Sequence, residues 1–146
     1  MFDMRIKKLF FDRRAVIDAV SRAKRKVLSR MGAFIRTAAR SSIRKRKGVS
    51  APGSPPHSHT GLLKRFIFFG YDPQTDSVVI GPAKLNKGGE APHVLEFGGT
   101  TVVEKRRLSG KHERRRVNIR PRPYMGPALQ KEQSKLPPMW AGSIKG

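Results

Sequence analysis

Apolar residues recur every three or four positions in the first third of the chain. Asp12 can cap the N-terminus of a helix there, and cations occupy much of the remaining circumference. The apolar stripe comprises Val16, Val20, Ala23, Val27, Met31, Phe34 and Ala38. This spacing predicts an amphipathic helix over residues 13–47, preceded by an N-terminal arm of residues 1–12.

Such a helix would extend on the order of 50 Å, more than the sheet of a chain this small can cover. Either it breaks at Gly32, where glycine costs about 1 kcal/mol relative to alanine, or its first half packs against a neighbouring copy. We favour packing in an assembly. The helix must end by Lys47, because Gly48 can cap it and the following prolines cannot continue it. Residues 48–63 are therefore expected to form a rigid Pro/Gly-rich loop.

Short apolar runs bounded by turn residues predict an antiparallel sheet within residues 64–126. Residues 66–69 and 77–81 read as a first hairpin. After a glycine-rich connection at residues 86–89, His93–Phe97 is expected to be a strand inside the sheet. Residues 101–120 read as a second hairpin with a basic tip at Ser109-Gly110.

The C-terminal part reads as one short helix followed by a tail. Pro127 suits the first turn of a helix over residues 127–136, and Pro137-Pro138 is expected to end it, which leaves residues 137–146 as a tail. The chain is thus predicted to be a single α+β domain over residues 1–146. Its long N-terminal amphipathic helix would pack on an antiparallel sheet of about four to five strands, with a short C-terminal helix.

The amino-acid composition limits the kinds of partner that the protein can bind. Lys and Arg number 32 against 10 Asp and Glu, which gives a formal net charge of +22 and indicates a strongly anionic partner. The absence of cysteine excludes disulfides and thiolate metal sites and suits assembly in a reducing cytosol. No apolar run approaches the roughly 20 residues that span a bilayer, and charges interrupt the N-terminal stretch too often for a signal peptide. We therefore expect a soluble protein with no membrane partner.

Three turn-rich blocks follow one another at residues 51–63, 91–100 and 120–129. In this order they resemble the tail-completion, or head-tail joining (neck), proteins of long-tailed double-stranded DNA bacteriophages, over roughly residues 30–131. The residues that carry the resemblance are Thr60, Gly61, Leu62, Glu96, Phe97, Gly98, Thr100, Arg122, Pro123, Tyr124, Pro127, Ala128 and Leu129. Residues 101–119 look like an insertion into the family pattern, and residues 1–11 have no counterpart in it.

The resemblance implies a structural virion protein at the head-tail junction, assembled in the host bacterial cytoplasm. It would form a homo-oligomeric ring, expected to be a hexamer, around the DNA passage. The implied partners are neck or connector proteins on the head side and tail terminator or tail tube proteins on the other. Closed cyclic symmetry would require one patch of each copy to meet a different patch of the next.

Two basic clusters are candidate contacts to DNA or to an acidic partner. They comprise Arg44, Lys45, Arg46, Lys47, Lys105, Arg106, Arg107, Lys111, Arg114, Arg115 and Arg116. Such contacts give affinity without sequence choice, so any contact with genomic double-stranded DNA is expected to be nonspecific. Because many phosphate contacts would retard moving DNA, we expect the two basic surfaces to have different tasks. The hairpin tip would reach the DNA passage or the DNA end, and the cationic helix face would dock on acidic rings of the connector or the tail. The alternative interpretation is a sequence-nonspecific DNA- or RNA-binding module.

Catalytic chemistry has little support in the sequence. His57 and His59 could be two metal ligands, but no nearby cysteine or carboxylate cluster completes a shell. Glu96 is a single acid in an apolar segment without a recognisable catalytic partner, so we expect it to form an ion pair with an arginine of its own or a neighbouring subunit. We expect no enzyme, metal or cofactor.

Overall fold

The computed structural model describes residues 12–83 and 90–144. The predicted arm, apart from Asp12, and the predicted connection at residues 86–89 lie outside the described residues. The elements are α1 (Arg13–Ser42), α2 (Leu62–Arg65), β1 (Ile67–Asp72), β2 (Ser77–Pro82), α3 (Ala91–Phe97), β3 (Gly99–Arg106), β4 (His112–Ile119), α4 (Met125–Glu132), the 3-10 turn η1 (Gln133–Lys135) and α5 (Leu136–Trp140).

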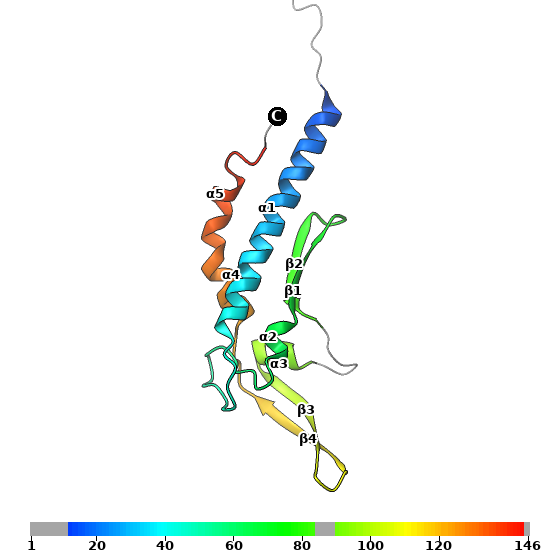
Figure 1. The fold of residues 1–146 in the computed structure, drawn as a ribbon, viewed down its shortest axis with the longest axis vertical. Coiled ribbons are helices and arrows are strands. Elements are labelled where there is room, and N and C mark those ends of the chain that lie inside the picture. The colour runs from blue at the N-terminus through cyan, green and yellow to red at the C-terminus, as the bar shows by residue number, and fades with distance from the viewer. Residues whose placement is uncertain (1–11, 84–89, 145–146) are drawn as a thin grey trace, which may run out of the picture.

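The long helix α1 forms the axis of an elongated molecule (Figure 1). Helices α4 and α5 lie along one side of it, and the β1–β2 hairpin lies along the other. The β3–β4 hairpin extends beyond the end of α1 that is opposite its N-terminus. The described chain is therefore a layered body around α1 with one hairpin projecting from it.

Helix α1 begins where the sequence predicts and does not break. The Asp12 side chain accepts a hydrogen bond from the Ala15 backbone N–H at 3.0 Å, as a helix cap should. The helix continues through Gly32, where a Cβ atom would lie 2.8 Å from both Phe69 Cδ2 and Val78 Cγ2. Glycine at this point lets the β1–β2 hairpin pack closely against the helix. The break considered at Gly32 is therefore absent.

The helix ends at Ser42, five residues before the predicted boundary. Ile43 turns to extended backbone geometry, and its side chain is completely buried. Arg44 then pairs with His57 in an isolated parallel bridge, and its carbonyl accepts the Ser58 N–H at 2.9 Å. The prediction to residue 47 was wrong because burial of Ile43 and pairing with the loop outweigh helical propensity in the basic run.

The main core lies where α1 meets β1 and α4. Its buried members are Met31, Ile35, Ala39, Ile43, Ile67, Tyr124 and Ala128. The predicted stripe is buried at Ala23, Val27 and Met31, after which Ile35 and Ala39 are buried in preference to Phe34 and Ala38. Val16 is exposed, so the first turns of α1 contribute little to this core.

The described residues contain four strands, arranged as two antiparallel pairs instead of one sheet. β1 pairs with β2 so that Ile67 lies opposite Pro82 and Asp72 opposite Ser77. β3 pairs with β4, as predicted for the second hairpin, so that Gly99 lies opposite Ile119 and Arg106 opposite His112. The α+β class, the long N-terminal helix and the antiparallel strands are confirmed.

The segment predicted as a central strand, residues 93–97, belongs to helix α3. Pro92 lies in the first turn, where a missing N–H does no harm, and Gly98 ends the helix at a φ of 78° with its N–H bonded to the Val94 carbonyl. These two end signals outweigh the β-propensity of the short apolar run. The loop that precedes β1 also differs from prediction, because Leu62–Arg65 forms one helical turn, α2, before the strand.

The C-terminal helix is confirmed but extends differently. α4 begins at Met125, with Pro127 in its first turn, and continues through the 3-10 turn into α5. Pro137-Pro138 was expected to end the helix, but these residues open α5, whose first turn tolerates proline. Part of the predicted tail is therefore helical. Among the described residues, no helix has the length and apolarity needed to cross a membrane.

Candidate functional site

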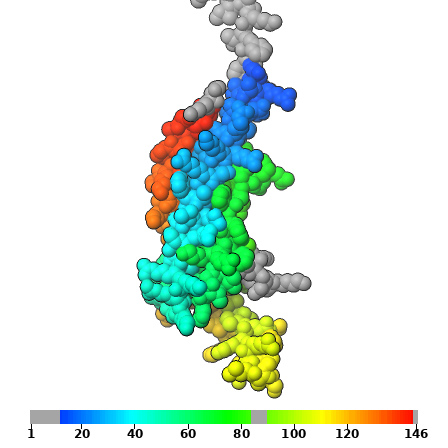
Figure 2. Space-filling model, in the orientation of Figure 1, coloured from blue at the N-terminus to red at the C-terminus, as the bar shows by residue number. Residues whose placement is uncertain are grey.

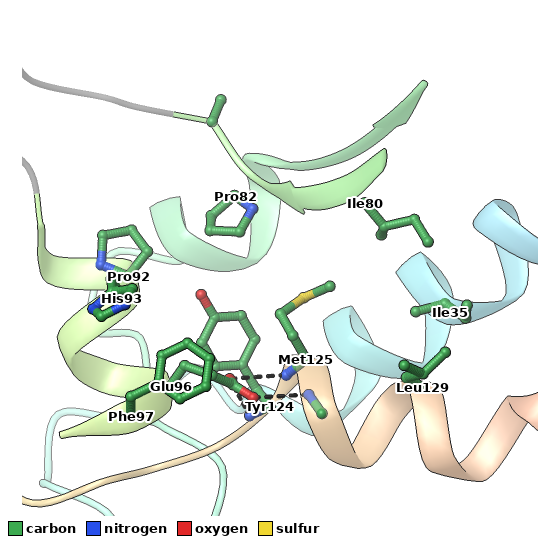
Figure 3. A pocket seen from close by; sticks show the side chains of 12 residues that line it. Ile35, Ile80, Pro82, Pro92, His93, Glu96, Phe97, Tyr124, Met125 and Leu129 are labelled. Atoms are coloured by element: carbon green, nitrogen blue, oxygen red, sulfur yellow. Dashed lines mark hydrogen bonds between the residues drawn. The ribbon is translucent and has the colours of Figure 1, made fainter. Parts of the chain in front are cut away.

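Glu96 is the centre of a polar hub beneath the apolar core. Its carboxylate accepts the backbone N–H groups of Tyr124, Met125 and Gly126 at 2.8, 3.0 and 2.8 Å (Figure 3). These N–H groups belong to the N-terminal turn of α4, where they lack partners within the helix and where a negative charge is favoured. The predicted ion pair to an arginine is therefore wrong within the described chain, in which Glu96 forms no ion pair and caps a helix instead.

Further backbone contacts join the three turn-rich blocks at this hub. The Arg122 N–H donates to the Leu95 carbonyl at 2.6 Å, and the Arg122 side chain donates through Nε to the Ser50 carbonyl at 3.0 Å. The Gly53 N–H donates to the Pro121 carbonyl at 2.9 Å. Gly98 lies so close to Pro121 that a Cβ there would be 2.9 Å from the proline Cδ. Segments distant in sequence thus converge on one point.

Tyr124 lies directly above Glu96 and is almost fully buried, with 1% of its surface exposed. Burial, with a smaller contribution from the Glu96 carboxylate, raises the pKa of Tyr124 to about 12. Its hydroxyl forms no hydrogen bond with any described residue and points into a cavity of about 530 Å³. We call this cavity the Tyr124 pocket. It is lined by Ile35, Ile80, Pro82, Ala83, Pro92, His93, Glu96, Phe97, Tyr124, Met125, Gly126 and Leu129.

The other residues that carry the resemblance are spread over the loop before α2, the core and the exposed surface. Gly61 turns the chain at a φ of 80° just before α2, while Thr60 and Leu62 are exposed. Ala128 is buried in the core, and Phe97 and Leu129 are exposed at the rim of the Tyr124 pocket. The remaining motif residues are the half-buried Pro123, the exposed Pro127 and the exposed Thr100 of β3. The hub unites the second and third motif blocks most directly.

The β3–β4 hairpin carries seven of the eleven candidate contact residues on a projecting lobe (Figure 2). Arg114 lies opposite Glu104 and Arg116 opposite Val102 on one face, while Arg115 lies opposite Val103 on the other. Arg114 Nε pairs with Glu104 at 3.0 Å, and Arg107 Nη2 pairs with Glu113 at 2.7 Å. Lys105, Arg106, Lys111, Arg115 and Arg116 form no ion pair within the described part of the chain. Unpaired cations therefore lie on both faces.

The second predicted cluster, Arg44 to Lys47, lies in the exposed segment after α1 and not on the helix itself. Arg46 and Lys47 line a groove of about 530 Å³ with Arg120 and Arg122, at the base of the hairpin. Arg120 was not among the predicted contacts. Its nearness to Arg46 comes from the folding of the loop onto the hub, which no local sequence signal reveals.

His57 and His59 border the same groove. His57 Nδ1 is hydrogen-bonded to the Gly48 carbonyl at 2.9 Å, so that nitrogen holds the loop. Across residues 12–83 and 90–144, no three histidine or carboxylate side chains lie close enough together to bind a metal ion. His57 thus has a structural contact in this loop, whereas His59 lines the groove.

Comparisons with protein-family models, with curated proteins and with solved structures each give no match.

Proposed function

We propose that this protein is a structural virion component of a bacteriophage head-tail junction. It forms a ring, expected to be a hexamer, around the DNA passage and couples the neck or connector on the head side to the tail terminator or tail tube. The proposal starts from the resemblance carried by the three turn-rich blocks. It describes a protein that acts by shape and surface charge and performs no catalysis.

One observation carries the proposal furthest: Glu96 of the second block binds the backbone of the third block at Tyr124, Met125 and Gly126. Residues that define a family by sequence should have a shared physical task. Here the glutamate caps the closing helix and the glycines permit close backbone approach. The motif thus makes sense as the framework of a body, which supports a structural role over a catalytic one.

The cationic β3–β4 hairpin supports the part of the proposal that assigns a role to surface charge. Unpaired cations on both of its faces suit a position between anionic groups on two sides, as in a DNA passage or between acidic rings. A flat docking surface would need cations on one face only. The exposed start of α1 likewise presents arginines that can meet an acidic ring.

The direct test is genetic. In the phage that encodes this chain, a null mutation should give DNA-filled heads and completed tails that do not join, as seen by electron microscopy of lysates. Adding the purified chain to that lysate should restore joined particles. Normally joined virions without the chain would refute the proposal.

The rival function is a sequence-nonspecific DNA- or RNA-binding module, and the same exposed hairpin favours it. Such a module should bind duplex DNA or RNA as an isolated monomer, with an affinity that falls steeply as salt rises. A joining protein should bind free nucleic acid weakly and assemble with itself or its ring partners. Sedimentation of the chain alone and with a 30-base-pair duplex, across a salt series, separates the two.

A further inference from the structure

The Tyr124 pocket has properties that call for an occupant. Its walls come from α1, the end of β2, α3 and α4, and they are mainly aliphatic, aromatic and proline side chains. Phe97 and Leu129 stand at its rim with 70% and 49% of their surface exposed. Apolar surface of this kind is unfavourable in water unless something covers it.

The Tyr124 hydroxyl adds a specific requirement. The side chain is 99% buried, yet its hydroxyl has no partner in the described chain and points into the cavity (Figure 3). An occupant that displaces water from this cavity must supply a hydrogen-bond partner to the hydroxyl, because a hydroxyl buried without one is unfavourable. The Glu96 carboxylate is already engaged with three N–H groups. A peptide with apolar side chains and a free backbone carbonyl meets these conditions.

The charge around the pocket limits which peptide fits. None of the described residues that line it is Lys or Arg, although the chain has 32 such residues. By contrast, the groove between α1 and α5 is lined by Arg22, Lys26 and Arg30, and the groove at the hairpin base by four cations. A cationic peptide would be repelled from those grooves but not from the Tyr124 pocket.

The chain itself contains such a peptide in residues 1–11, which combine Arg5, Lys7 and Lys8 with seven apolar residues. The apolar residues are Met1, Phe2, Met4, Ile6, Leu9, Phe10 and Phe11. We infer that this segment of a second copy docks in the Tyr124 pocket, with Phe10 and Phe11 as its anchors and a backbone carbonyl bonded to the Tyr124 hydroxyl. This inference rests on the proposed self-assembly into a ring.

Chain length assigns the occupant to a second copy. α1 rises about 1.5 Å per residue, so Asp12 lies roughly 35 Å along the helix from the level of Ile35, which lines the pocket. Phe10 is two residues from Asp12 and can reach no more than about 7 Å from it. Phe10 and Phe11 therefore cannot fill the pocket of their own chain. An N-terminal segment that meets a different patch on the next copy is the kind of contact that a ring requires.

Single-cysteine cross-linking tests the inference in the full chain, because the sequence contains no cysteine. A tagged Phe10→Cys chain is mixed with an untagged Leu129→Cys chain under mild oxidation, and the disulfide-linked pair is quantified on a non-reducing gel. The matched control replaces Leu129→Cys with Val49→Cys, an 82% exposed apolar site in the loop. We expect at least fivefold more linked pair with Leu129→Cys. Adding Tyr124→Phe to the Leu129→Cys chain should reduce linkage about three- to tenfold.

Sedimentation of the unmodified chain distinguishes the possible failures. An oligomer without preferential Phe10–Leu129 linkage would overturn the docking inference and leave the ring proposal intact. A chain that stays monomeric and unlinked would overturn both. A disulfide within one monomer of the Phe10→Cys/Leu129→Cys double variant would refute the second-copy assignment. If only purified neck or tail ring proteins protect the thiol of the Leu129→Cys variant from alkylation, the pocket belongs to those partners instead.

Discussion

Glu96 and Glu113 show how differently one residue type serves two regions of this molecule. In the hub, the Glu96 carboxylate accepts three backbone N–H groups and joins α3 to the start of α4. On the projecting hairpin, Glu113 pairs with Arg107, and 47% and 63% of those two side chains are exposed. The Glu96 carboxylate supplies hydrogen bonds to N–H groups that have no partner within helix α4. The ion pair on the hairpin is exposed, so water and salt weaken it. Stability should therefore depend on the hub, which leaves the hairpin surface available for partners.

The largest effect is expected from Glu96→Ala. Loss of the acceptor leaves three N–H groups at the start of α4 without their partner, so the free energy of unfolding should fall by about 2–4 kcal/mol. Glu96→Gln keeps one acceptor oxygen and should lose less. Urea unfolding measures both. The control Glu90→Ala, an exposed residue with no capping hydrogen bond, should change stability by less than about 0.5 kcal/mol. Equal stability of Glu96→Ala and wild type would show that the hub contributes no more to stability than the hairpin does.

Alkaline pH should expose the contribution of Tyr124. Its pKa is raised from 10.0 to about 12 in the folded protein, so the stability that its neutral form provides is complete below pH 10 and is lost as pH rises through 12. The loss should reach about 2 kcal/mol near pH 12, relative to Tyr124→Phe, which cannot ionise. Unfolding curves at several pH values from 9 to 12 measure this difference. The pKa of the other tyrosine, Tyr71, is also raised, by its hydrogen bond to Asp76, and cancels in the comparison of the two proteins.

Removing hairpin cations should change binding much more than folding. The double variant Arg115→Ser/Arg116→Ser removes two exposed arginines that form no ion pair among the described residues, so stability should change by less than about 0.5 kcal/mol per site. If the hairpin meets DNA, the slope of log affinity against log salt should become shallower by up to about 2. Arg13→Ser/Arg14→Ser makes the same charge change at the exposed start of α1. Equal losses in both double variants would mean that DNA contact is not concentrated in the hairpin.

The smallest effect is expected for the hairpin ion pair between Glu104 and Arg114. Their side chains are 50% and 77% exposed, so the coupling free energy should be only a few tenths of a kcal/mol and should fade in high salt. A double-mutant cycle with Glu104→Gln and Arg114→Gln measures it. A coupling above about 1.5 kcal/mol would show that the hairpin is more rigidly organised than its exposure indicates.

Local signals predicted much of the fold. The cap at Asp12, the start of α1, the β1–β2 and β3–β4 hairpins and the helix around Pro127 all follow from short-range patterns. The errors have two different causes. Ile43 leaves the helix to enter the core, which only tertiary packing decides. Residues 93–97 are helical because the local end signals Pro92 and Gly98 outweigh the β-propensity of the apolar run.

The candidate site was harder to predict than the elements. Glu96 was selected from its motif, but its partners are N–H groups that every residue except proline carries. Side-chain chemistry pointed instead to an arginine, and Glu96 pairs with none in the described chain. The groove shared by Arg46 and Arg120 depends on long-range folding of the loop. The unpartnered Tyr124 hydroxyl likewise becomes visible only when the pocket walls are assembled.

The chain segments before and after the β3–β4 excursion, that is, the β3–β4 hairpin with its flanking residues, are joined at its base. The Arg122 N–H bonds the Leu95 carbonyl there, and the Tyr124 N–H bonds the Glu96 carboxylate. Because both ends of the excursion are fixed there, its length is uncoupled from the rest of the architecture. Adding two residues to each strand preserves the inward and outward alternation and advances the tip by about 7 Å. Evolution or engineering could thus change the length of the β3–β4 hairpin in regular increments, while the hydrogen bonds at its base stay unchanged.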